Sequence, residues 1–359
     1  MQIGALMLES LLELALAKKE EIRNKLEDFY ASGPDTDKYW VNYSFKENKQ
    51  ETTISAGDGS INKKKFLSFV FYAISAETLI YDTKLEKIEN SQMDIMPHHR
   101  FVEDRLRNYM SIYELKSALK SLKLHNPDYY LFDGSILGNL IRPIPLDREL
   151  DNNLKDKIKS LYMDRLKNEL DSGDVEISSP RFENEISKSF RNKTEATIYL
   201  ENLENLLVIS KLLKNGKKIV GISKTSTRDD YFNFEVPDMA LFDRNHRKQG
   251  YSKPIPVPMD VAGEVKRDFP VENDFFRSLT FTIFYARLED NKNLLKFELP
   301  YRADENEIKE LLSIIKSTCV EGYPYLLKKA HNDVVIKKID MIRLMRIMGF
   351  IEKDGREML

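Results

Sequence analysis

The sequence predicts a mixed α/β fold in which one central sheet is assembled from two halves of the chain. Aromatic and β-branched residues cluster into three neighbouring strands within the first hundred residues, and a short apolar strand follows at 128–132. Further apolar strands recur after residue 216. Helical patterns separate and close these strands, so helices are expected to flank the sheet.

The first part of the chain is typical of one helix followed by three antiparallel strands. Strands are expected at 52–57, 66–74 and 78–81, with a turn at Asp58-Gly59-Ser60. A leading helix is expected at 3–30, where apolar residues recur at spacings of three, four and seven. The residues that form this apolar stripe are Leu8, Leu11, Leu12, Ala15, Ile22, Leu26 and Phe29.

The middle of the chain alternates a helix, a strand and two long charged helices. A helix at 98–122 precedes the strand at 128–132. Charged helical patterns at 148–170 and 183–213 are joined by a Ser/Pro/Gly-containing break, and together they indicate an insertion. The remaining strands and helices are expected at 217–223, 276–287, 294–299, 305–317 and 325–348.

The length allows two domains or one elaborated domain with insertions, and we expect a single domain over residues 1–359. The core is expected at about 48–145 together with about 214–348. The leading helix at 3–30 and a helical insertion at about 148–213 are expected to be additions to that core.

Composition narrows the class of protein. The chain has 56 Lys and Arg residues against 58 Asp and Glu residues, a formal net charge of −2, so any nucleic-acid site is expected to be a local groove. Cys319 is the single cysteine, which excludes an intrachain disulfide and fits a reducing, cytoplasmic location. The most apolar runs contain Glu9, Glu13 and Glu77, so no membrane segment is expected.

The strongest chemical signal is a tripeptide that occurs twice, Asp58-Gly59-Ser60 and Asp133-Gly134-Ser135. Each aspartate is expected at the last residue of a strand, where ligand-binding groups of α/β sheets gather. The pair Asp-Gly is also the commonest hairpin turn, so either copy alone fits a turn as well. Two copies in strands separated by a helix favour a shared site.

Two neighbouring carboxylates repel each other and require a cation. Oxygen ligands select hard Mg²⁺ or Mn²⁺ over zinc. The intervening helix offers Glu103, Asp104 and Glu114 as a third carboxylate. Glu114 has the more apolar neighbours, although an exposed helix carboxylate remains an equal alternative on the pattern alone.

The ordered set of four motifs resembles the NurA nucleases of archaea. These motifs are Gly57-Asp58-Gly59-Ser60, Phe132-Asp133-Gly134-Ser135, Gly221-Ile222-Ser223-Lys224, and Gly322-Tyr323-Pro324 followed by Lys328-Lys329-Ala330-His331. The resemblance implies an RNase H-like core and a homodimer that acts beside the HerA hexameric translocase in DNA end resection. It also implies a Mn²⁺-dependent 5′-to-3′ exonuclease and single-strand endonuclease, with Mg²⁺ as the other candidate metal.

Carried over residue by residue, the resemblance implies five catalytic residues. The metal ligands would be Asp58, Glu114, Asp133 and His331, and Tyr323 would act beside them. On an expected helix that begins near Pro324, Tyr323 and His331 would lie about 80° apart, on adjoining faces. Both side chains would then face one cleft.

Candidate DNA contacts are a lysine at a strand end, the basic run at 243–254, and the lysine triplet at 63–65 that closely follows Asp58. Lys224 follows an expected central strand, and Arg247 and Lys248 lie in a basic run that contains Tyr251. Solvated lysines and arginines are an equal alternative. Two other functions also remain open at this point: a catalytically inactive RNase H-like adaptor that binds nucleic acid, and a metal-dependent phosphohydrolase for small substrates.

Overall fold

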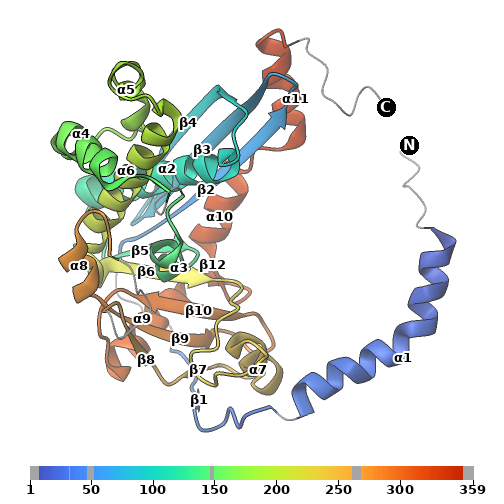
Figure 1. Ribbon diagram of the computed structural model, residues 1–359. Helices are drawn as coiled ribbons and strands as arrows, with labels where there is room; N and C mark the ends of the chain where they lie inside the picture. Colours follow the sequence, from blue (N-terminus) through green and yellow to red (C-terminus); the bar gives the residue numbers. More distant parts are fainter. Residues whose placement is uncertain (1–7, 32, 47–51, 146–148, 261–267, 351–359) are drawn as a thin grey trace.

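The computed structural model describes residues 8–31, 33–46, 52–145, 149–260 and 268–350. Most described strands belong to one large sheet with helices on both faces (Figure 1). Its strand order is β1-β7-β9-β10-β6-β5-β2-β3-β4, and β8 pairs with β9 outside this path. The strands are β1 (Trp40–Asn42), β2 (Ile54–Lys65), β3 (Phe69–Tyr81), β4 (Leu85–Pro97), β5 (Tyr129–Asp133), β6 (Ile219–Ser223), β7 (Gly250–Ser252), β8 (Ile255–Pro258), β9 (Thr280–Arg287) and β10 (Leu294–Leu299).

Five neighbouring strands confirm the expected RNase H-like mixed sheet. Along β4-β3-β2-β5-β6 the first two pairings are antiparallel, and the pairings of β2 with β5 and of β5 with β6 are parallel. Strand β10 then pairs antiparallel with β6. The sheet therefore joins strands from both halves of the chain, as the element order predicted.

The boundaries of the first three strands differ from the prediction. Strand β2 continues without interruption from Ile54 to Lys65, so the turn expected at Asp58-Gly59-Ser60 is wrong. Asp58 pairs with Glu77 in the middle of the β2–β3 hairpin. The segments expected at 66–74 and 78–81 form one strand, β3. Its partner β4 was not predicted, because β4 is an edge strand whose side chains are mostly polar and exposed, so it lacks a clear apolar pattern.

Helices cover the two faces of the sheet and bury two separate apolar layers. Helix α2 (Val102–His125) packs on β2 and β3 from one face, and α6 (Lys193–Leu213) packs on α2. Helices α9 (Glu305–Ser317) and α10 (Tyr325–Val334) close the opposite face. Four shorter helices lie elsewhere in the described chain: α3 (Ile136–Ile141), α7 (Asp238–Asn245), α8 (Asn273–Ser278) and α11 (Lys338–Ile347).

Two predicted helices are interrupted, and one predicted strand begins late. The pattern at 325–348 forms α10 and α11, which are separated by residues 335–337. The strand expected at 276–287 begins only at Thr280, because α8 occupies the residues before it. Residues 183–213 form α5 (Glu183–Ser189) and α6, with a break between them.

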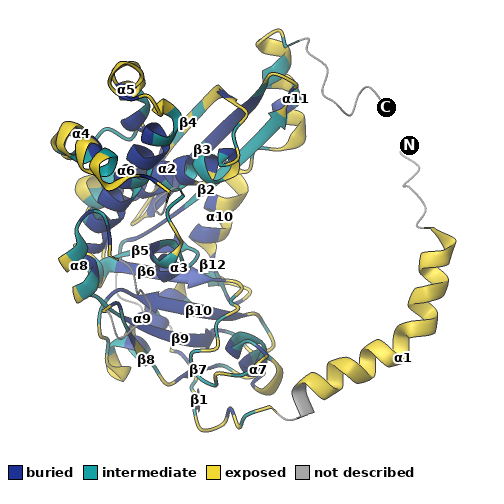
Figure 2. Cartoon of the chain, in the orientation of Figure 1, coloured by how far each residue is buried: buried dark blue, intermediate teal, exposed yellow. Residues whose placement is uncertain are grey.

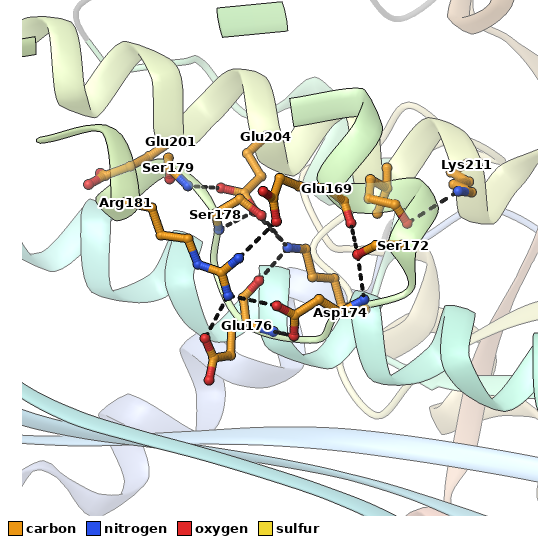
Figure 3. A network of polar contacts seen from close by, with 12 residues as sticks. Glu169, Ser172, Asp174, Glu176, Ser178, Ser179, Arg181, Glu201, Glu204 and Lys211 are labelled. Carbon is orange, nitrogen blue, oxygen red and sulfur yellow. Dashed lines mark hydrogen bonds and ion pairs between the residues drawn. The ribbon is translucent and has the colours of Figure 1, made fainter. Parts of the chain in front are cut away.

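The helices between β5 and β6 are tied together by buried charges. Helix α4 (Asn152–Ser172) leads through a 3₁₀ turn at Ser179–Phe182 into α5 and α6. Glu204 on α6 accepts hydrogen bonds from the backbone N–H groups of Ser178 and Ser179, each at 2.8 Å, and pairs with Lys116 of α2 at 2.8 Å (Figure 3). Both side chains of this ion pair are almost fully buried.

Helix α1 (Glu9–Ala31) lies apart from the sheet (Figure 1). Figure 2 colours the described residues of this helix as exposed, and its apolar residues Leu16 and Ile22 retain 69% and 57% of their accessible surface. The first residues of the predicted helix, 3–7, lie outside the described residues. Among the helices that the structure describes, none combines the length and apolarity needed to cross a membrane.

Candidate metal centre

Three side chains from distant parts of the chain converge beside the centre of the sheet. One ligand atom from each of Asp58, Asp133 and His331 lies within 4.8 Å of the other two. His331 Nδ1 is 2.7 Å from Asp58 Oδ2. The two aspartates are largely buried, whereas His331 is about half exposed, so the group is open to solvent from the side of α10.

Strand pairing explains why the two aspartates meet. Strands β2 and β5 run parallel, and their pairing ends with Gly57 opposite Phe132. Asp58 and Asp133 each follow directly, so their side chains extend toward the same face of the sheet from adjacent strands. Helix α10 crosses that face and supplies His331.

Glu114 approaches from the opposite side of the sheet. It is buried on α2, and its Oε2 lies 3.6 Å from the position that a Cβ atom would take at Gly59. Such a Cβ would also come within 2.9 Å of Met110. Glycine at position 59 therefore leaves room for α2 and for a carboxylate beside the aspartates. Glu114 itself lies outside the group defined by the 4.8 Å spacing.

The other two candidate carboxylates of α2 are engaged elsewhere. Glu103 pairs with Lys63 and Lys65 of β2, and Asp104 lies 3.5 Å from Arg107 on its own helix. Of the three acidic residues on α2 that the sequence offered, the structure places Glu114 next to the aspartates.

The carboxylates around Asp58 and Asp133 are largely buried and close together, so a bound cation would stabilise them. Burial raises the pKa of Asp58, the hydrogen bond to His331 opposes this rise, and the charge of Asp133 adds to it. Burial raises the pKa of Glu114 far above its ordinary value, and the charges of Asp58 and Asp133 contribute to the rise. Glu114 Oε1 is buried without a hydrogen-bond partner. A hard divalent ion fits this set of carboxylate and imidazole donors.

Tyr323 and Lys224 border the same group. Lys224 Nζ lies 2.9 Å from Asp133 Oδ2 and 4.9 Å from the centre of the Tyr323 ring. Tyr323 is held in the small hairpin of β11 (Cys319–Val320) and β12 (Tyr323–Pro324), which precedes α10. Burial, followed by the charge of Asp133, raises the pKa of its hydroxyl well above its ordinary value.

The basic run around Arg247 and Lys248 lies elsewhere in the sheet. It precedes β7, and strands β9, β10 and β6 separate β7 from β5. Arg247 lies 3.6 Å from Asp243 on α7. The structure therefore does not bring these two residues, which the sequence suggested as DNA contacts, to the acidic group.

Sequence reasoning missed one pair of charged residues near the group. Lys296 and Glu298 are fully buried on β10, and Glu298 contacts the turn that follows Asp133. The signal was present in the segment Leu294–Leu299, where two charges are spaced by two residues inside an otherwise apolar strand. That spacing places both side chains on one face of the sheet.

Comparison with known proteins gives a consistent result. The NurA domain family model matches residues 52–336. The "Probable DNA double-strand break repair nuclease NurA" of Methanocaldococcus jannaschii is 33% identical, over 99% of this chain and 92% of the relative. The "DNA double-strand break repair nuclease NurA" of Saccharolobus solfataricus is 26% identical, over 92% of this chain and 88% of that relative.

Solved structures show the same fold. The crystal structure of the NurA nuclease from Sulfolobus solfataricus superposes with a TM-score of 0.75, at 22% identity, over 96% of this chain and 97% of that chain. A crystal structure of NurA bound to dAMP and manganese gives a TM-score of 0.65, at 17% identity and 98% coverage of both chains. The family match and the similarity over nearly the whole length confirm the resemblance seen in the sequence: this chain belongs to the NurA family.

Proposed function

We propose that this chain is a metal-dependent DNA nuclease that acts in the repair of double-strand breaks. The observation that supports the proposal most is the group formed by Asp58, Asp133 and His331, with buried Glu114 beside it. In detail we propose 5′-to-3′ exonuclease and single-strand endonuclease activity, carried by one nuclease domain over residues 1–359 with its core at 48–145 and 214–348. The names of the NurA relatives support a role as a nuclease in the repair of DNA double-strand breaks.

The proposed centre would use four residues as ligands. Asp58, Glu114, Asp133 and His331 would hold Mn²⁺, with Mg²⁺ as the other candidate, and a bound ion would supply charge stabilisation and an acidified water for phosphodiester hydrolysis. Solved NurA structures with manganese support this choice of metal.

Two further residues would act on the substrate. Tyr323 would orient the scissile phosphate, because its ring and hydroxyl border the aspartates. Lys224 would contact a phosphate oxygen. It lies against Asp133 in this structure, so its ammonium group is already within reach of the site.

Substitution of either aspartate tests the activity. We expect Asp58→Asn or Asp133→Asn to lower the cleavage rate by at least about 100-fold, because several kcal/mol of charge stabilisation are lost at about 1.4 kcal/mol per tenfold in rate. The measurement is degradation of end-labelled single-stranded DNA with Mn²⁺, with Mg²⁺ and with a chelator.

Asp156→Asn is the matched control, because Asp156 is exposed on α4, and this variant should cleave at the wild-type rate. Full activity in Asp58→Asn or Asp133→Asn would contradict the site. Binding of DNA without cleavage by the wild type under all metal conditions would instead favour the inactive RNase H-like adaptor.

Glu114 provides a test through pH. With its pKa raised above the ordinary 4.5, the folded metal-free protein holds a proton on Glu114 that the unfolded chain has released, so stability falls as the pH rises above about 4.5. We expect Glu114→Gln to remove this contribution, so that its melting temperature falls less steeply from about pH 5 to about pH 8 than that of the wild type.

The same variant should lose Mn²⁺-dependent cleavage. Glu310→Gln is its control, since Glu310 is exposed on α9 and should retain both the wild-type pH slope and the wild-type rate. A melting profile of Glu114→Gln that parallels the wild type in chelator would show that Glu114 is not held protonated.

We also propose a homodimer. Helix α1 exposes more apolar surface than an isolated helix normally presents to water, and a second copy would cover it. Light scattering should give about twice the 42.0 kDa mass of one chain. Replacing Leu12 and Ile22 by Glu should return the chain to a single-copy mass, whereas Leu161→Glu on α4 should not. A wild-type mass of 42.0 kDa across the micromolar range would contradict the dimer.

The proposed partner is the HerA hexameric translocase. With a net charge of −2, this chain has little long-range field to attract DNA, so a motor that feeds strand into the site would raise the rate. We expect degradation of a kilobase duplex to be much faster with HerA and ATP than with the nuclease alone, or with HerA and a non-hydrolysable nucleotide. Equal rates in the three reactions would argue for a self-sufficient nuclease.

A further inference from the structure

The turn that follows Asp133 is held against the sheet from two directions. Gly134 adopts a φ of +128° and donates its N–H to the carbonyl of Ile222 on β6 at 2.8 Å. Ser135 then begins the short helix α3, and its Oγ accepts a hydrogen bond from the N–H of Gly138 at 2.8 Å. The position of this turn fixes where the backbone of Asp133 lies.

Glu298 of β10 holds the same turn from the other direction. Its Oε1 accepts a hydrogen bond from Ser135 Oγ at 2.6 Å, and its Oε2 accepts the N–H of Leu137 at 2.9 Å. Lys296 Nζ, buried two residues away, donates to Oε1 at 2.8 Å. Charge-assisted hydrogen bonds of this kind are short and strong, so the carboxylate fixes the first turn of α3 directly after Asp133.

The sheet is shaped to allow this contact. Glu298 lies opposite Gly221 of β6, which in turn lies opposite Phe132 of β5. A Cβ atom at Gly221 would meet the carbonyl oxygen of Gly134 and the side chain of Ile136 at 3.2 Å. Glycine at position 221 lets the turn after Asp133 lie close to the sheet. The turn is then within reach of Glu298 on β10, the strand on the far side of β6.

We propose that Glu298, charge-compensated by Lys296, is a positioning residue that sets the geometry of Asp133 and thereby the metal affinity of the site. Glu298 lies outside the group formed by Asp58, Asp133 and His331, and it acts through the turn at Gly134 and Ser135. The inference rests on the proposed metal centre. Removing hydrogen-bond partners behind a metal ligand generally costs roughly 10- to 100-fold in affinity or activity.

The chain contains a matched control. Glu204 is also buried, accepts hydrogen bonds from two backbone N–H groups at the start of a 3₁₀ turn, and is paired with a buried lysine, Lys116. Lys116 lies two residues from Glu114 on α2, about 200° around the helix, and so extends away from the metal centre. Loss of Glu204 should cost stability as loss of Glu298 does, without displacing Asp133.

The experiment compares Glu298→Gln with Glu204→Gln by two measurements on the full chain. Thermal unfolding in chelator reports stability, and calorimetric titration with Mn²⁺, in the absence of DNA and below both unfolding transitions, reports metal affinity. We expect both variants to melt below the wild type. The dissociation constant for Mn²⁺ should rise at least about tenfold in Glu298→Gln, and should stay within about twofold of the wild type in Glu204→Gln.

Ser135→Ala provides a milder variant, because it removes one donor to Glu298, together with the acceptor of the Gly138 N–H, and leaves the Lys296–Glu298 pair intact. Its Mn²⁺ affinity should fall in the same direction, by a smaller factor. Unchanged affinity in Ser135→Ala and Glu298→Gln, or an equal loss in Glu204→Gln, would overturn the positioning role. If the wild-type protein binds Mn²⁺ but cleaves no DNA, only the proposed nuclease activity is contradicted. If the wild-type protein binds no Mn²⁺, both the proposed metal centre and the positioning role of Glu298 are overturned.

Discussion

The parallel pairing of β2 with β5 is the constraint on which the site depends. It brings Asp58 and Asp133 to adjacent positions on one face of the sheet, where two carboxylates repel each other. Neither residue can move away on its own, since β2 is paired along its whole length with β3, and the turn after β5 is bonded to β6. The sheet thus holds an unfavourable arrangement that an ion would relieve.

Helices on opposite faces of the sheet add one side chain each to the two aspartates, and these two side chains differ in their exposure to solvent. Helix α10 brings a half-exposed imidazole, whereas α2 brings Glu114, which burial keeps from ionising easily. A substrate would therefore approach from the α10 side, where Tyr323 and Lys224 also lie. The α2 side would serve as a closed, water-poor wall. This division follows from Gly59, which is small enough to let α2 reach the strand.

Much of this could be anticipated from local sequence, and the rest could not for identifiable reasons. The repeated Asp-Gly-Ser contained both aspartates of the group, and the apolar neighbours of Glu114 singled out the α2 carboxylate that the structure places near them. The same Asp-Gly pair was wrong as a turn signal at Asp58, because pairing with β3 across the hairpin overrides a two-residue preference. Glu298 and Ser135 are 163 positions apart in the sequence, so a local sequence pattern cannot predict that they form a hydrogen bond.

The hydrogen bond between His331 and Asp58 spans 273 positions of sequence. During synthesis, β2 and β5 can form long before the helix that carries His331 has left the ribosome. Partly made chains would therefore present two clustered aspartates without the imidazole and without Tyr323. Such contacts between distant segments also form late in folding, because the loop that they close is long. The proposed metal centre would therefore lack His331 and Tyr323 until the fold is nearly complete.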